Sequence, residues 1–551
     1  MKLPRNDIRR LELVQEIRET CLASRQSRMN RYVTFRNYFL HGMADGGKSA
    51  WNQVYPSLDL LTSFLYAADT TKFSVELSSG TSRVDYGRTD ALAKRIHEKW
   101  SASNADLVFG DCLTWSLVYD STFMKLIRRK GSIHPFMVDP GSFGVYREDV
   151  PMLDRQDAFI HVYYMTLPEL DRALALHPRR DSIMKKVIAS KTKKDIAQEA
   201  PPLIERVSMS AITPNLIGEA SVNLNASPDY RAEISADLVE MGEIWAWDDD
   251  QDDYQIITMA SDLDIIYDRP NFFMPRSRRW EGEHCFVQVC PNPLPDYFWG
   301  QSEIDRLAPL QDKLNKRMDD VERLLSKQVD PPSAWTGQGI IEEKLEALNY
   351  PGSQVGIGAD PTIKKHEFKP DVPLDVYRDV EKIEAQFMLA MGLSNVLLGR
   401  GESGVRSAGH ANKLANLGGA RPKKRALIIE GSLDKISTLY GRILYQDDDS
   451  ILLDDKGVAF TIAQMDPDFT CTVDGHSNSP VFMDNQRENA AILFKARAIN
   501  RRRLIEMIGP PKQEELIRDL EEKIIPAEQA AARAEQEAIA QGNAAKLKSV
   551  K

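Results

Sequence analysis

The longest amphipathic pattern in the chain lies between residues 300 and 332. Its apolar residues are spaced three and four apart, which is typical of one face of a long α-helix: Ile304, Leu307, Leu310, Leu314, Met318, Val321 and Leu325. Gly300 interrupts what precedes the pattern. We expect Ser302 to cap the helix, because its hydroxyl can accept a hydrogen bond from a free backbone N–H group, and the acidic Asp305 suits the first turn. The helix should end near Gln328, since Pro331 and Pro332 follow.

The opposite face of this expected helix is polar and mostly basic. It carries four cationic residues: Lys313, Lys316, Arg323 and Lys327. One apolar and one charged face are typical of a helix that packs along one side and faces water along the other. The basic residues either pair with acidic groups such as Asp320 and Glu322, or meet a partner outside the chain. The pattern leaves both interpretations open.

A second amphipathic helix is expected from Pro373 to about Met391, again with apolar residues three and four apart: Val376, Val380, Ile383, Phe387 and Met391. A glycine-rich stretch, LLGRGESGVRSAGH, follows it from Leu397 to His410. Between the two helices, residues 331–370 have the short apolar runs and glycines of a compact insert with short strands and a brief helix near residues 342–348.

The rest of the chain predicts an α+β fold. Helices are expected over residues 6–40, 51–67, 90–100, 106–119, 167–175 and 407–439, and over most of 481–551. The helix at 407–439 should be broken or bent near Gly418, Gly419 and Pro422. Strands are expected at 72–77, in the turn-rich stretch 121–149, and at 157–164, 238–268 and 443–475. Residues 178–230 show no regular pattern, although they include the basic run Met184–Lys194.

Composition is that of a globular protein. The 551 residues are 42% hydrophobic and 28% charged, and this length indicates about three or four domains. No apolar run approaches the roughly 18 residues that span a bilayer, and the charged N-terminal stretch does not resemble a secretory signal, so we expect assembly in a cytoplasm. Five cysteines are an odd number, which argues against a disulfide framework and for reduced thiols.

The motif nearest to an enzyme signature is GRGESG, residues 399–404. It matches the first six positions of a phosphate-binding P-loop, but Val405 and Arg406 stand where lysine and serine or threonine are required. The acidic turn after Asp248 lacks the glycine and glutamate of an EF-hand loop. Zinc-binding and nucleophile-elbow spacings are also missing from the sequence. We therefore name no catalytic residue, metal or cofactor, and keep a nucleotide-dependent DNA-processing enzyme with a degenerate phosphate loop as the alternative.

The order of these features resembles the portal proteins of tailed bacteriophages, particularly those of the podovirus type. Four stretches carry the resemblance: PNPLPDYFWGQSEIDRL, LQDKLNKRMDD, PPSAW and FMLAMGLSNVLLGRGESGVRSAGHANKL. The resemblance implies a mixed α/β wing formed by residues 1–300 and 412–480, a first stem helix at 301–328, a clip at 329–371 and a second stem helix at 372–392. It further implies a tunnel loop at 393–411 and a helical crown and tail at 481–551.

The resemblance implies a structural protein and not an enzyme. About twelve copies would form a ring, a homododecamer, at one vertex of a capsid. Double-stranded DNA would pass through its channel during packaging and ejection. The expected protein partners are the terminase large subunit, a tail adaptor, the major capsid protein and the scaffold, with no membrane. The ring would be assembled in the host cytoplasm and end in the virion.

Three groups of candidate site residues follow from the resemblance. Tunnel-loop residues expected to face DNA are Arg400, Arg406 and His410, and clip residues expected to bind partners are Trp335, Glu342, Glu343 and Lys344. The basic face of the first stem helix either contacts DNA or pairs within the chain or with a neighbouring subunit. A net charge of −10 per chain gives a ring of roughly −120, so local basic groups would decide where DNA touches.

Overall fold

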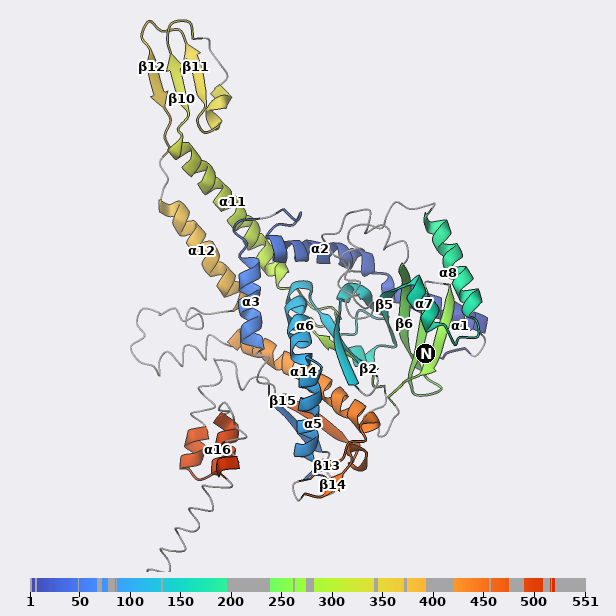
Figure 1. The fold of residues 1–551 in the computed structure, drawn as a ribbon. Coiled ribbons are helices and arrows are strands. Elements are labelled where there is room, and N and C mark those ends of the chain that lie inside the picture. Colours follow the sequence, from blue (N-terminus) through green and yellow to red (C-terminus); the bar gives the residue numbers. More distant parts are fainter. Residues whose placement is uncertain are drawn as a thin grey trace, which may run out of the picture. The chain divides into compact units, whose positions relative to one another are not determined.

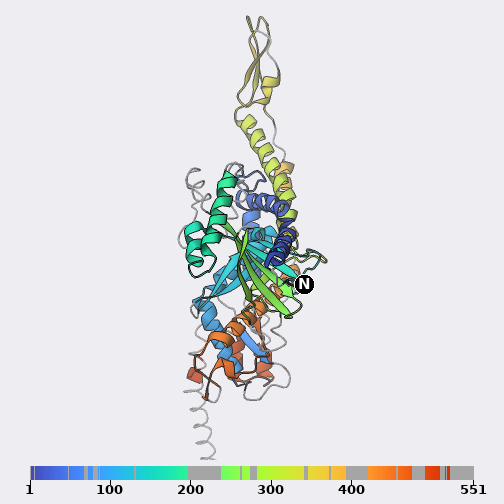
Figure 2. The ribbon, with the colours of Figure 1, turned by 90° about the vertical axis from the view of Figure 1, so that its right-hand side faces the viewer.

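The computed structural model describes residues 2–4, 7–47, 49–66, 72–77, 85, 87–129, 132–195, 238–260, 263–273, 282–340, 345–370, 374–392, 420–454, 457–474, 490–508, 516 and 518–520. The chain divides into two compact units, Met1–Gly475 and His476–Lys551. Helices and mainly antiparallel strands share the first unit, which confirms the α+β class (Figures 1 and 2).

The expected helix over residues 6–40 is two helices, α1 (Asp7–Leu22) and α2 (Arg25–His41). The single-helix prediction was wrong because the two halves pack on different cores. In α1, Val14 and Ile17 pack against one core cluster, whereas Tyr32 and Phe35 of α2 belong to another. The chain turns between them, where the Ser24 hydroxyl hydrogen-bonds to Glu148 instead of capping α2.

Three further helices of this unit agree with the sequence pattern within a few residues at each end. They are α3 (Val54–Leu65), α5 (Thr89–Ala102) and α6 (Ala105–Tyr119). The chain then enters two antiparallel sheets. The first has the order β3-β2-β9, with β2 at Thr122–Arg129, β3 at Ser132–Val138 and β9 at Phe286–Val289.

The second sheet has the order β4-β5-β6-β7-β8, and its strands are β4 (Phe143–Val145), β5 (Ala158–Thr166), β6 (Leu238–Asp248), β7 (Asp253–Ala260) and β8 (Asp264–Pro270). The hairpin expected around the acidic turn is the β6–β7 pair, in which Asp248 lies opposite Asp253. The short helix α7 (Leu167–Ala173) begins with a capping box formed by Thr166 and Glu169.

The first part of the stretch that we expected to be irregular is a helix, α8 (Arg180–Asp195). Its apolar residues are few, but Ile183 and Val187 are four apart and pack on Leu170 and Val239. Lys186, from the basic run, donates a hydrogen bond to Asp264 at 2.6 Å. This lysine of the basic run is therefore already engaged in an ion pair within the protein.

Residues far apart in the sequence meet around the long helix α14 (Ala420–Asp447). Strand β1 (Lys72–Leu77) pairs with β15 (Phe469–Asp474), and Trp100 of α5 contacts the ring of Tyr440 with centroids 5.4 Å apart. Pro422 is the third residue of α14, where no intrahelical N–H partner is lost, and the part of the predicted break at Gly418 and Gly419 lies outside the described residues. A small pair, β13 (Leu452–Leu453) and β14 (Ala459–Phe460), follows α14.

Two helices and a small sheet form the remainder of the first unit. Helix α11 (Ile304–Val329) leads into strands β10 (Ser333–Thr336), β11 (Gln354–Gly358) and β12 (Lys364–Glu367), and α12 (Leu374–Met391) returns beside α11 (Figure 1). The strand order is β11-β10-β12, and a 3₁₀ helix, Leu345–Asn349, precedes β11. We call α11 and α12 the helix pair and the three strands the insert sheet.

Other short 3₁₀ helices lie at Pro140–Ser142, Leu153–Arg155 and Ile462–Gln464. In the second unit, helix α16 spans Arg501–Ile508, within the stretch 481–551 that was expected to be mostly helical. Among the described helices of both units, none is sufficiently long and apolar to cross a bilayer.

Candidate functional site

The buried face of α11 follows the predicted apolar row in its first five turns. Ile304, Leu307, Leu314 and Val321 are buried, whereas Leu325 is 38% exposed, so the row leaves the core before the helix ends. Sequence reasoning missed Gln311, which is fully buried on this face. Its side-chain amide donates to the Trp51 carbonyl at 3.0 Å and accepts from the backbone N–H of Gln53 at 3.0 Å.

The start of α11 is held by the end of α6. The backbone N–H of Glu303 donates to the Leu117 carbonyl at 2.9 Å, and the Ser302 hydroxyl donates to the Val118 carbonyl. These are carbonyls of the last turn of α6, which have no partner inside their own helix. Ser302 lies one position before the N-cap, Glu303, and its hydroxyl accepts from the Ile304 N–H at 3.0 Å. The predicted cap is therefore displaced by one residue.

Four groups from four segments meet at this point, and we call them the Arg425 cluster. The guanidinium of Arg425, at the start of α14, lies 2.6 Å from the Glu303 carboxylate, donates to Asn292 at 3.0 Å and donates to the Met391 carbonyl at 3.2 Å. The Asn292 amide in turn donates to Glu303 at 2.7 Å. Arg425 thus ties the first residue before α11 to the last residue of α12.

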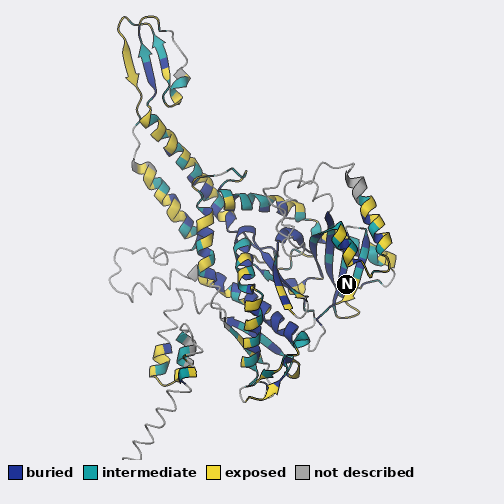
Figure 3. Cartoon of the chain, in the orientation of Figure 1, coloured by how far each residue is buried: buried dark blue, intermediate teal, exposed yellow. Residues whose placement is uncertain are grey.

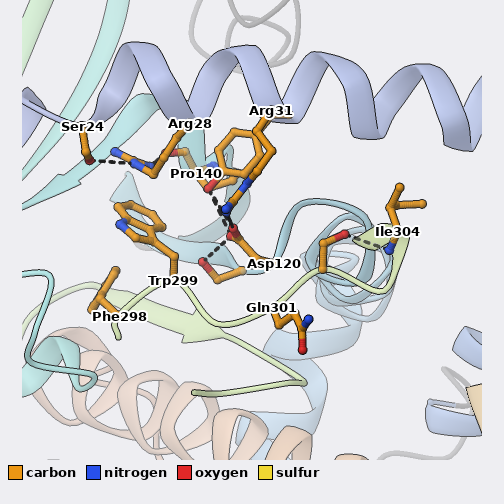
Figure 4. Close-up of polar contacts among 12 residues, drawn as sticks. Ser24, Arg28, Arg31, Asp120, Pro140, Phe298, Trp299, Gln301 and Ile304 are labelled. Carbon is orange, nitrogen blue, oxygen red and sulfur yellow. Dashed lines mark hydrogen bonds and ion pairs between the residues drawn. The ribbon is translucent and has the colours of Figure 1, made fainter. Parts of the chain in front are cut away.

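A second polar cluster lies between α2 and the segment that precedes α11 (Figure 4). The guanidinium of Arg28 stacks over the ring of Trp299, 3.6 Å from its centroid, and donates to the carbonyls of Pro140 and Phe143. The Trp299 indole N–H donates to Glu148 at 2.8 Å. The N–H groups of Arg28 and Trp299 described above all donate to acceptors within the protein. These hydrogen bonds hold the segment that precedes α11 in place.

Asp120 is the most unusual titratable group of this second cluster. It is fully buried directly after α6 and has a positive φ of 123°, a backbone angle that non-glycine residues rarely adopt. Arg31 and Tyr32 of α2 donate to its carboxylate at 2.7 and 3.1 Å (Figure 4). Burial raises the pKa of Asp120 to about 7, although these two partners and Arg28 oppose the rise.

The predicted basic face of α11 is exposed to solvent along most of its length (Figure 3). Arg323 donates to Asp320 at 2.5 Å, so for this residue the structure shows the pairing that we had left open. Lys313 and Lys316 are exposed, and Lys327 is half-buried. Another arginine, Arg317, spans the helix pair and donates to Asp379 of α12 at 2.8 Å.

Trp335 lies in the central strand of the insert sheet and is half-buried. Its indole N–H donates to the Ser333 hydroxyl at 3.1 Å, and the Lys365 ammonium lies 5.4 Å from its ring centroid. The other predicted clip residues, Glu342, Glu343 and Lys344, lie outside the described residues. So do Arg400, Arg406 and His410, together with the motif at 399–404.

The five cysteines are unpaired, and all but Cys290 are buried. Burial raises the pKa of the Cys290 and Cys471 thiols to about 12, so they are protonated at neutral pH. Within the described ranges, no group of three or more histidine, cysteine, aspartate or glutamate side chains is arranged to hold a metal ion.

In searches of known proteins, no family model and no curated protein matches this chain.

We predict that Arg425→Ala lowers the free energy of unfolding by about 3–5 kcal/mol, because it leaves the Glu303 carboxylate buried without its main partner. Adding Glu303→Gln to this variant should recover part of the loss, since an amide is less costly to bury than a charge. Denaturant unfolding followed by tryptophan fluorescence measures both. The matched control is Lys424→Ala at the exposed neighbouring position. Equal losses in Arg425→Ala and Lys424→Ala would contradict the role given to Arg425.

The raised pKa of Asp120 predicts a pH dependence of stability. A carboxyl group with a pKa near 4 when unfolded and about 7 when folded favours the folded state most below pH 4 and loses that contribution as the pH rises to 7. Relative to Asp120→Asn, the wild type should therefore become less stable between about pH 4 and 7, by at most about 4 kcal/mol. Parallel unfolding curves at three pH values across this range test it. A stability difference that stays constant would refute the assignment.

Proposed function

We propose that this chain is a portal protein, the subunit of a ring that forms the DNA channel at one vertex of a tailed-phage capsid. In this proposal, the ring admits double-stranded DNA during packaging and releases it during ejection. Within the first unit, the helix pair is the stem, the insert sheet is the clip and the other elements form the wing. The chain has no catalytic role of its own, and the energy for DNA movement comes from ATP hydrolysis by the docked terminase.

The observation that carries the proposal is the return of α12 to the start of α11. Arg425 contacts both Glu303, directly before α11, and the carbonyl of Met391, the last residue of α12. The intervening residues form a small sheet of their own, with β10 in the middle. A pair of antiparallel helices with an insert at its far end supports the stem-and-clip interpretation, because such a rigid pair can present a binding surface away from the main body.

The insert sheet offers a surface suited to protein partners. Strand β12 is exposed along its whole length, and Tyr350, Ile363 and Phe368 are exposed apolar side chains in the same insert. Aromatic residues are enriched in protein interfaces relative to the rest of the surface. We propose that the terminase and then the tail adaptor dock here, while the capsid protein and scaffold contact other parts of the ring.

The DNA contacts proposed for the tunnel loop rest on Arg400, Arg406 and His410. A ring repeats each of these residues in every subunit, and contacts to phosphate oxygens do not depend on the base sequence. Many weak contacts of this kind permit sliding, whereas the acidic net charge of the chain disfavours tight coating of DNA. The alternative, a nucleotide-dependent DNA-processing enzyme, rests on residues 399–404 alone, and ATP turnover by the purified chain would support it.

The double variant Arg400→Ala with Arg406→Ala should assemble like the wild type and retain or package less DNA, because it removes the proposed phosphate contacts. Sedimentation measures assembly, and protection of DNA from nuclease measures retention. Lys94→Ala with Lys185→Ala, at exposed positions on α5 and α8, is the control for the loss of two positive charges. Rings that fall apart in the arginine variant would show a structural role and overturn the assignment.

A further inference from the structure

The charged residues of the helix pair that form no ion pair within the described part of the chain have opposite signs on its two sides. Leu314, Val321 and Ile383 are buried residues of the pair. On α11, Lys313 directly precedes a buried residue and Glu322 directly follows one. On α12, Lys382 precedes Ile383 and Glu384 follows it. Each step along an α-helix turns by about 100°, so residues before and after a buried position lie on opposite flanks of that helix.

The antiparallel arrangement places like charges of the two helices on the same side. The contacts of Arg425 with Glu303 and Met391 show that the start of α11 lies beside the end of α12. Two antiparallel helices that face each other are related by a twofold axis perpendicular to the plane that contains both helix axes. Rotation about this axis exchanges the two helices but keeps each side chain on the same side of that plane. Residues that precede the contact row therefore share one side of the pair, and residues that follow it share the other.

On this basis the pair has a basic side and an acidic side. Among the residues without an ion pair, the basic side presents Lys313 and Lys382, with Lys316 on the adjoining outer face of α11. The acidic side presents Asp319, Glu322, Glu381 and Glu384. All seven side chains are exposed, and none forms an ion pair with another described residue. Three arginines of the same region are already engaged: Arg317 with Asp379, Arg323 with Asp320 and Arg378 with Asp375.

The two sides also lie at the same height along the pair. The ion pair between Arg317 and Asp379 sets the register of the two helices. Because the helices are antiparallel, a residue a given number of positions after Arg317 is level with the residue the same number of positions before Asp379. Lys313 is then level with Ile383, and Asp319 with Tyr377. At 1.5 Å per residue, the seven charged side chains originate within about 15 Å of one another along the helix axis.

We infer that the basic side of the helix pair of one copy packs against the acidic side of the next copy. This inference rests on the proposed ring, in which each subunit uses two different surfaces in a head-to-tail contact. Surfaces of opposite sign at equal height fit such a contact without a rise from one copy to the next. If the helix pair lined a DNA channel, only its basic side would be needed, and the acidic side would have no role. Lys313 and Lys316 are thus subunit-contact residues, in place of the DNA contact considered from the sequence.

Charge reversal on each side tests the inference. One variant carries Lys313→Glu with Lys316→Glu, which makes both sides acidic. The other reverses all four acidic residues, Asp319→Lys, Glu322→Lys, Glu381→Lys and Glu384→Lys, which makes both sides basic. Each variant alone should need at least about tenfold more protein to assemble than the wild type, because like charges then face each other. An equimolar mixture should assemble again, since acidic and basic copies can alternate around the ring. Sedimentation velocity over a range of concentrations measures all three samples.

A matched control reverses two lysines away from the helix pair, Lys94→Glu with Lys185→Glu, and should assemble like the wild type. The outcomes separate the inference from the proposed function. Wild-type protein that stays monomeric at every concentration overturns both. Wild-type rings together with unaffected assembly of both reversed variants overturn only the inference. Rings of the Lys313 and Lys316 variant that form normally but retain less DNA would assign these lysines to the channel and also overturn it.

Discussion

The ion pair between Arg425 and Glu303 is the interaction on which the arrangement of the first unit depends most. A buried carboxylate is costly unless a partner neutralises it and its hydrogen bonds are made, so the pair admits few other positions for either residue. The planar guanidinium reaches three groups at once: the carboxylate before α11, the Asn292 side chain and the carbonyl at the end of α12. The beginning of α14, the entry to α11 and the return of α12 are thereby fixed by one side chain.

The remaining contacts around α11 extend this constraint into the body of the unit. The last turn of α6 supplies carbonyls to Ser302 and Glu303, and Asp120 at its end is held by Arg31 and Tyr32 of α2. Gln311 connects the middle of the buried face to the segment before α3. Beyond these anchors, the helix pair is held by its apolar contact row and by Arg317 with Asp379, and its two charged sides are free to meet other molecules. A rigid base and exposed flanks are what a subunit needs if its helices pack against copies of themselves.

Periodicity predicted the helix pair and the strand at 72–77 well, because local spacing alone decides them. It did not show which side chains meet across the fold. Arg425 was visible only as part of the basic run 421–425, and its partners Glu303 and Asn292 lie more than a hundred residues away in the sequence. Asp120 gave no signal, since its burial and its partners Arg31 and Tyr32 depend on how the fold packs α2 against the end of α6. The break between α1 and α2 was missed for a similar reason. The apolar pattern is continuous along the sequence, but its two halves pack on different cores. The pairing of Arg323 with Asp320, three residues apart, was within reach of the sequence, and it was one of the two interpretations considered.

The native mass of the purified wild-type chain, measured together with negative-stain images, tests the central claim most directly. We expect a closed ring of about twelve copies with a central channel, because the helix pair offers two complementary sides at one height. A chain that remains a monomer across the full range of accessible concentrations would contradict it.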